Sequence, residues 1–215
     1  MTSRLYPLRV LFTVGFDLDM TLIDPRAGMI EIFDVLARET GIPLDGRAFA
    51  TRLGPPLQTE FARYGLDDAT IARLVARYRE LTPQFTIPRT VALPGAREAL
   101  EAVTDSGGRV VVVTAKFAPN AVAHLDHLGL RVDAVVGDLW STAKAGALRD
   151  HGAEIYVGDH LGDVAAARAA DALSVGVATG PISAEDLSAA GADVVLPDLT
   201  GFPAWLQTYL YATVH

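Results

Sequence analysis

The 215-residue chain has no cysteine, which excludes disulfide bonds, thiolate catalysis and cysteine-ligated metal sites. It also has no run approaching the ~18 apolar residues of a membrane span, so no membrane association is expected. The net charge of −8 argues against a broad basic surface for nucleic acid. Residues 1–12 lack a clean apolar stretch and a small-residue cleavage site, so we predict no signal peptide and a cytoplasmic protein.

Lysine is scarce, since 16 of the 18 basic residues are arginine and only Lys116 and Lys144 are lysine. The lysine ammonium is a compact charge on a flexible stem, which a planar guanidinium does not replace. Lys144 in particular is therefore a candidate functional residue.

The stretch FDLDMTLID, residues 16–24, is the most informative in the chain. It follows a mostly apolar run, and residues two apart on a strand point to the same side. Asp17 and Asp19 are therefore expected to leave a buried strand together. Two such carboxylates repel each other unless a cation or a shared proton relieves them.

Strand-like and helical segments alternate along most of the chain, which predicts an α/β fold with a doubly wound parallel sheet. Continuous valine and isoleucine runs are typical of parallel strands that are buried on both faces. The predicted strands are 11–16, 109–114, 132–137, 154–158, 173–178 and 192–196, and the predicted helices between them are 95–106, 119–128, 143–151 and 163–171.

One region interrupts this alternation, because residues 25–88 contain no convincing strand. Three segments, 28–40, 55–64 and 68–82, carry apolar residues at helical spacing, the last behind a predicted N-cap at Asp67. We therefore predict a small α-helical cap domain at 25–88, inserted after the first strand of an α/β core domain formed by 1–24 and 89–215.

Ligands of an open parallel sheet bind beyond the carboxyl ends of its strands. Polar residues gather there in this sequence: Asp17, Asp19, Thr21, Thr114, Ala115, Lys116, Lys144, Asp159 and Asp163. A hard divalent cation, Mg²⁺ above all, would balance the four carboxylates. Lysine and threonine would then hold a phosphoryl group, which an aspartate can attack while a second carboxylate moves protons.

Four segments in this order, FDLDMTLID, VVVTAK, STAKAGAL and VGDHLGDVAAARAADA, resemble the motifs of the haloacid dehalogenase-like hydrolase superfamily. PGAREALEAV and KFAPNAVAHLDHLGL further resemble its phosphoglycolate-phosphatase-like branch. The resemblance covers residues 12–200 and implies a Rossmann-like core with an α-helical cap, acting on a small phosphorylated metabolite as a monomer or homodimer.

The resemblance also implies roles for single residues. Asp17 resembles the nucleophile, Asp19 the general acid and base, Thr114 the phosphate-binding hydroxyl and Lys144 the residue that steadies both nucleophile and phosphate. The implied Mg²⁺ ligands are Asp17, the backbone carbonyl of Asp19 and Asp159, with Asp163 in support. Further candidates for substrate binding are Thr21, Ala115, Lys116, Arg26 and Arg52.

Three positions depart from the family pattern: Met20 and Asp171 stand where glycine is usual, and His160 where a small hydroxyl residue is common. His124 and His127 share a predicted helix, and we expect them on a solvated face rather than in a metal site.

Several functions remain alternatives to a Mg²⁺-dependent phosphatase. A phosphomutase shares every motif, whereas a hydrolytic dehalogenase does not need Asp19. A receiver-type signalling domain gathers similar residues but lacks the cap, and the full set of acids argues against a silent binding protein.

Overall fold

The computed structural model describes residues 12–214. Residues 1–11, from which we predicted no signal peptide, and hence the first residue of the predicted 11–16 strand, lie outside the described residues. A six-stranded sheet forms the centre, with strand order β5-β4-β1-β6-β7-β8. All of its pairs are parallel. The strands are β1 (Thr13–Phe16), β4 (Arg109–Val113), β5 (Ala134–Val136), β6 (Ala153–Gly158), β7 (Leu173–Val177) and β8 (Val194–Leu196).

Helices cover both faces of this sheet, as residues alternate along each strand. On β4, Val110 and Val112 join one hydrophobic cluster, whereas Val111 and Val113 join another. The first cluster includes residues of α5 (Ala96–Asp105), α6 (Ala118–Leu128) and α10 (Phe202–Val214), and the second includes residues of α7 (Lys144–Asp150) and α8 (Leu161–Ala169). The predicted doubly wound α/β fold is confirmed.

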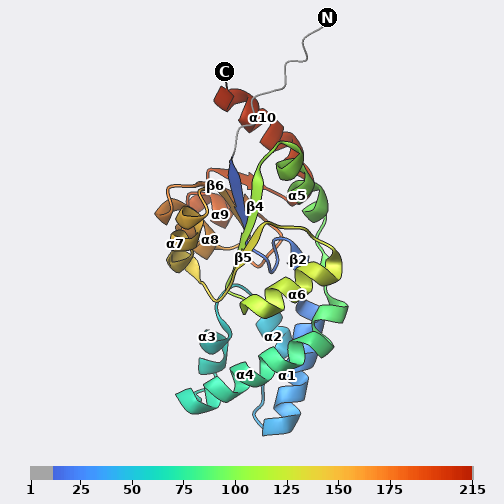
Figure 1. Cartoon of the computed structure of the whole chain (residues 1–215). Coiled ribbons are helices and arrows are strands. Elements are labelled where there is room, and N and C mark those ends of the chain that lie inside the picture. Colours follow the sequence, from blue (N-terminus) through green and yellow to red (C-terminus); the bar gives the residue numbers. More distant parts are fainter. Residues whose placement is uncertain (1–11, 215) are drawn as a thin grey trace, which may run out of the picture.

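The first four helices after β1 form a separate layer, which we call the cap: α1 (Arg26–Thr40), α2 (Gly46–Ala50), α3 (Leu57–Ala62) and α4 (Asp68–Phe85). They enclose their own hydrophobic cluster, in which the Phe33 ring stacks on Phe49 and Phe61 with centroids 4.6 and 5.4 Å apart. The cap lies at one end of the sheet and α10 at the other (Figure 1).

A small antiparallel ribbon, which the sequence reading missed, joins the cap to the sheet. Strand β2 (Ile23–Asp24) leads into the cap and pairs with β3 (Val91–Ala92), which leads out of it after the short 3-10 helix η1 (Ile87–Arg89). The two segments that link the cap to the sheet therefore lie side by side.

Helix α4 connects the cap to α6. Asp67 caps α4 as predicted, accepting a hydrogen bond from the Thr70 N–H, and the helix runs three residues past its predicted end, through Pro83. Proline has no N–H to bond the carbonyl four residues earlier. The Asn120 amide of α6 donates to that carbonyl, on Arg79, at 3.2 Å.

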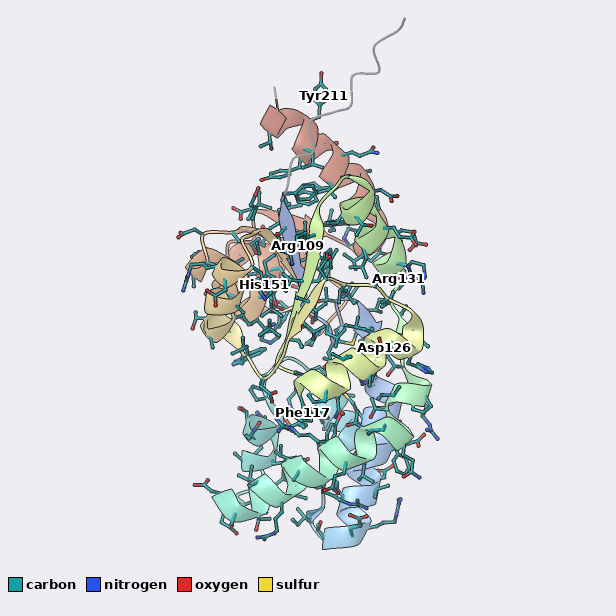
Figure 2. All side chains as sticks on the ribbon, in the orientation of Figure 1. Arg109, Phe117, Asp126, Arg131, His151 and Tyr211 are labelled. Atoms are coloured by element: carbon teal, nitrogen blue, oxygen red, sulfur yellow. The ribbon has the colours of Figure 1, made fainter. Side chains whose placement is uncertain are left out.

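The carboxyl ends of the strands face the cap. Phe117, just before α6, lies on the cap side, whereas Arg109, at the start of β4, lies toward the opposite end (Figure 2). On α6 itself His127 is exposed, but His124 is fully buried, so the predicted solvated face is wrong for His124. This side of α6 packs against α4 and η1, which exclude water.

The other elements are short: the 3-10 helices η2 (Ser141–Ala143) and η3 (Leu199–Gly201), and helix α9 (Ala184–Ala189). No helix among residues 12–214 is long and apolar enough to cross a membrane.

Candidate active site

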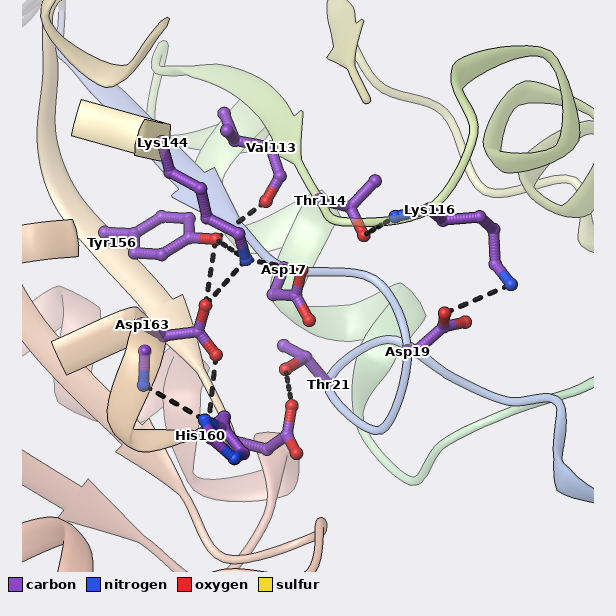
Figure 3. A network of polar contacts seen from close by, with 12 residues as sticks. Asp17, Asp19, Thr21, Val113, Thr114, Lys116, Lys144, Tyr156, His160 and Asp163 are labelled. Carbon is purple, nitrogen blue, oxygen red and sulfur yellow. Dashed lines mark hydrogen bonds and ion pairs between the residues drawn. The ribbon is translucent and has the colours of Figure 1, made fainter. Parts of the chain in front are cut away.

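The polar residues predicted to gather at the strand ends do lie together (Figure 3). The Asp17 N–H donates to the carbonyl of Val157 at 2.8 Å, and the Thr114 N–H donates to that of Val136 at 2.9 Å. The first bond extends the pairing of β1 with β6 by one residue, and the second extends that of β4 with β5. Both positions are thereby fixed. Asp159 follows the last residue of β6.

Lys144 lies at the centre of the site and is only 1% exposed. Its Nζ donates to Asp17 Oδ1 at 2.8 Å, to Asp163 Oδ1 at 2.7 Å and to the Tyr156 hydroxyl at 2.8 Å. Burial opposes the charged form, but the carboxylates of Asp163 and Asp17 outweigh it and raise the pKa of Lys144. Lys144 is therefore a fixed cation whose three donors are all used.

Tyr156 belongs to this site but was not found from the sequence. Its hydroxyl accepts from Lys144 and donates to the Val113 carbonyl at 2.7 Å, which links β6 to β4. Within the apolar run of β6 no neighbouring residue signals this role. The role of Tyr156 becomes visible only once the structure places Lys144, on α7, next to its hydroxyl.

Three buried carboxylates form a group suited to a metal ion. One oxygen from each of Asp17, Asp159 and Asp163 lies within 4.8 Å of the other two. Burial, and then the charges of Asp163 and Asp17, raise the pKa of Asp159 well above its ordinary value. A Cβ at Gly180 would collide with Asp159 Oδ2, so glycine lets the backbone approach this carboxylate. The all-oxygen donors and unbalanced negative charge fit a hard divalent cation.

Asp163 also holds the start of α8. Its Oδ2 accepts the backbone N–H of His160 at 3.1 Å, and His160 Nδ1 accepts from the Gly162 N–H at 3.0 Å. This reciprocal arrangement is a capping box. His160 therefore serves as the helix cap that a small hydroxyl residue would otherwise supply, and its ring packs 5.0 Å from that of Trp140.

Asp19 lies apart from the metal group, beside Lys116. Lys116 Nζ is 3.1 Å from Asp19 Oδ2, while Oδ1 of Asp19 is buried with no hydrogen-bond partner among the described residues. Burial raises the pKa of Asp19, although Lys116 lowers it. Asp17, Asp19, Thr114, Ala115 and Lys116 line one cavity with residues of the cap, which we call the catalytic cavity.

The remaining predicted residues have other partners. The Thr21 hydroxyl donates to Asp159 Oδ1 at 3.0 Å, so it orients a carboxylate. The guanidinium of Arg26 binds Asp24, and that of Arg52 binds Glu60, each at 2.6 Å. Neither arginine is among the residues that line the catalytic cavity.

The two positions where glycine is usual both have a left-handed backbone, with φ of 61° at Met20 and 57° at Asp171. Glycine adopts this region freely, which explains its use there. Aspartate tolerates it better than methionine. The Met20 side chain is buried in the cap cluster, and its carbonyl accepts the Thr179 hydroxyl at 2.5 Å. Packing thus holds Met20 in a conformation that its backbone disfavours.

The sequence was compared with protein families and with individual proteins. Residues 14–177 match the family model described as "Haloacid dehalogenase-like hydrolase". The chain is 30% identical to the "Phosphoglycolate phosphatase" of Caulobacter vibrioides over 218 residues, covering 92% of each chain. It is 28% identical to the "Probable phosphatase IndB" of Dickeya dadantii over 204 residues, covering 85% of this chain and 88% of that one.

The fold was compared with solved structures. A "predicted phosphatase" from Clostridium acetobutylicum superposes with a TM-score of 0.80 at 26% identity. The match covers 92% of this chain and 99% of that one, so it includes both the sheet and the cap.

Proposed function

The chain belongs to the haloacid dehalogenase-like hydrolases, and from that premise we propose that it is a Mg²⁺-dependent phosphatase. Its substrate would be a small phosphorylated metabolite, and the phosphoryl group would pass through an aspartyl-phosphate on Asp17. The observation that carries the proposal is the fixed contact between the buried Lys144 ammonium and Asp17, which lines the catalytic cavity. The two relatives, one named a phosphatase and the other a probable phosphatase, support it.

In the first step an oxygen of the Asp17 carboxylate attacks phosphorus, and the bond from phosphorus to the ester oxygen breaks. Lys144 holds the carboxylate in place from one side, so the attacking oxygen is oriented before the substrate arrives. The Thr114 hydroxyl, at the end of β4, donates to a phosphoryl oxygen on which negative charge develops.

Asp19 supplies and removes the protons. It donates one to the departing ester oxygen, which leaves as an alcohol. Asp19 then accepts a proton from the water that attacks the aspartyl-phosphate, which returns Asp17 as a carboxylate and releases inorganic phosphate. Its place in the cavity lining beside Asp17 supports both roles.

The residues suited to hold Mg²⁺ are Asp17, Asp159 and the backbone carbonyl of Asp19, with Asp163 in support. The ion would neutralise charge on the phosphoryl oxygens. In this arrangement Thr21 keeps Asp159 oriented, and Asp163 keeps Lys144 charged and in place.

We further propose that residues 25–88 act as a domain that closes over the site and excludes water during the reaction. The separate hydrophobic cluster of the cap and the paired crossings at β2 and β3 support this division. The cytoplasmic location and the oligomeric state stay predictions.

The test is release of inorganic phosphate from a panel of phosphate monoesters. We expect release with Mg²⁺, loss of release in excess EDTA, and recovery when Mg²⁺ is restored. Full activity in excess chelator would contradict the metal dependence. A phosphomutase would instead isomerise a sugar phosphate without releasing phosphate, which NMR of the same reactions would detect.

A further inference from the structure

The catalytic cavity has two unlike sides. The core side carries the reactive groups and ends at Asp17, Asp19, Thr114 and Lys116. The opposite side comes from the cap, and it faces the position that the leaving group of a phosphate ester would take. That side therefore decides which leaving groups fit.

The cap side is largely apolar. Met29, Phe49, Leu53, Leu57 and Tyr78 line it, and we call these five residues the apolar wall. All belong to the cap cluster or pack against it, so they are held rigidly. Burial, and then the nearby charge of Asp19, raise the pKa of the Tyr78 hydroxyl well above its ordinary value, so this side chain is neutral as well.

The chain next to the apolar wall packs directly against the core. Gly54, in the segment between α2 and α3, lies so close to His160 that a Cβ there would be 2.7 Å from the imidazole ring. Leu53 and Leu57 flank this contact. The cap and the core are therefore in direct contact next to Leu53, a residue of the apolar wall.

The cationic side chains that line the cavity are already paired with carboxylates. Arg79 is the one cap cation in the described lining, and it lies 2.6 Å from Asp138 and over the ring of Phe117 at 4.3 Å. Lys116 is paired with Asp19. A second anionic group on the substrate would have to break one of these pairs, or exchange its hydration for neutral groups such as the Gln58 amide and the Tyr78 hydroxyl. Neither balances a buried charge, so both are unfavourable.

From this contrast we propose that the substrate is a phosphate monoester of an uncharged alcohol with an apolar carbon skeleton next to the ester oxygen. A leaving group that carries a carboxylate fits poorly. The proposal rests on the proposed phosphatase function and narrows its substrate class. It also separates this chain from its relative named for phosphoglycolate.

The decisive test compares isobutyl phosphate with 2-phosphoglycolate, because the branched ends of their leaving groups are of similar size and only that of phosphoglycolate is charged. We expect kcat/KM for isobutyl phosphate to exceed that for phosphoglycolate at least ~10-fold, since burying the unpaired carboxylate is penalised. Equal values, or a preference for phosphoglycolate, would overturn the proposal. If neither these esters nor p-nitrophenyl phosphate releases phosphate, the phosphatase function itself fails, and this proposal with it.

A charge added to the wall gives a second, independent readout. Leu57→Lys should raise kcat/KM for phosphoglycolate and lower it for isobutyl phosphate, so that the ratio shifts at least ~10-fold toward the carboxylate. Leu66→Lys is the matched control, because Leu66 packs against the same cluster outside the cavity lining. An equal shift in both variants would contradict the role of the wall.

A truncation covers the case in which Leu57→Lys does not fold. Leu57→Ala should lower kcat/KM for isobutyl phosphate more than for phosphoglycolate, because only the apolar group loses a contact. Leu66→Ala should leave the ratio of the two unchanged. A Leu57→Ala variant that folds and keeps the wild-type ratio would refute the proposal.

Discussion

The two sides of the catalytic cavity are built on opposite principles. On the core side, charged groups are buried and hold one another: Lys144 at the start of α7 joins Asp17, just after β1, to Asp163 on α8. On the cap side the surface is largely apolar, and the nearby Arg52 and Arg79 are paired with carboxylates. Under the proposed function, the first arrangement would serve a reaction that all substrates share, and the second would serve recognition.

This difference affects how each side responds to substitution. A buried ion pair that loses one partner leaves an unpaired charge, which is costly. An apolar wall that loses a methyl group loses only contact area. The core side should therefore be intolerant of change and the cap side tolerant, and the following experiments test that contrast.

The largest effect is expected from Asp17→Asn, which keeps the size of the side chain but removes the nucleophile. Turnover should fall at least ~10³-fold, the scale seen when a group that acts in concert with others is removed. Initial rates of phosphate release measure the loss, and circular dichroism checks the fold. Near-normal turnover would mean that another residue receives the phosphoryl group.

The next largest effect is expected from Lys144→Met, measured by urea unfolding in EDTA. The change leaves Asp17 and Asp163 buried without their cation, which should lower the free energy of unfolding by about 3–5 kcal/mol. Lys116→Met is the control, because Lys116 is paired with Asp19 alone, and its loss should be smaller. A loss below about 1 kcal/mol at Lys144 would show that the carboxylates need no cation there.

A smaller effect concerns His124, a titratable group kept neutral by packing. Burial, and then the charge of Lys116, lower its pKa to about 2. As pH falls below the unfolded value of about 6.5, only the unfolded chain takes up this proton, so stability is lost on acidification. The loss between pH 7 and pH 5 should be about 2 kcal/mol from this group alone.

His124→Phe should remove that part of the acid sensitivity, because neither ring nitrogen of His124 has a hydrogen-bond partner in the described structure. Urea unfolding at the two pH values measures the difference from wild type. His127→Phe, at an exposed position on the same helix, is the matched control. Parallel curves for wild type and His124→Phe would rule out a buried neutral imidazole.

Much of the fold was predictable from local patterns. The valine-rich strands and Asp67-capped helix α4 carry their signals in consecutive residues, and β4 begins where predicted and ends one residue earlier. Helix α2, with five residues, is too short to show a periodicity, and two-residue strands such as β2 and β3 have none. Those elements depend on contacts with other segments of the chain, and short-range sequence patterns carry no signal of such contacts.

The same limit applies to the site. Asp17, Asp159 and Lys144 stand in motifs, and strand topology brings them together. The role of Tyr156 depends on Lys144, which donates to its hydroxyl from α7. The partners of Arg26 and Arg52 are local carboxylates, yet the sequence does not tell whether an arginine faces a cavity or a neighbouring acid.

Met20 limits how freely the cap and the core could be exchanged with those of a related protein. It lies in the loop between Asp17 and Thr21, but its thioether belongs to the hydrophobic cluster of the cap. A cap transplanted from a relative with glycine at this position would meet a side chain for which it has no space. In chimeras of this family, residue 20 should therefore be exchanged together with the cap, although in the sequence it lies within the catalytic loop.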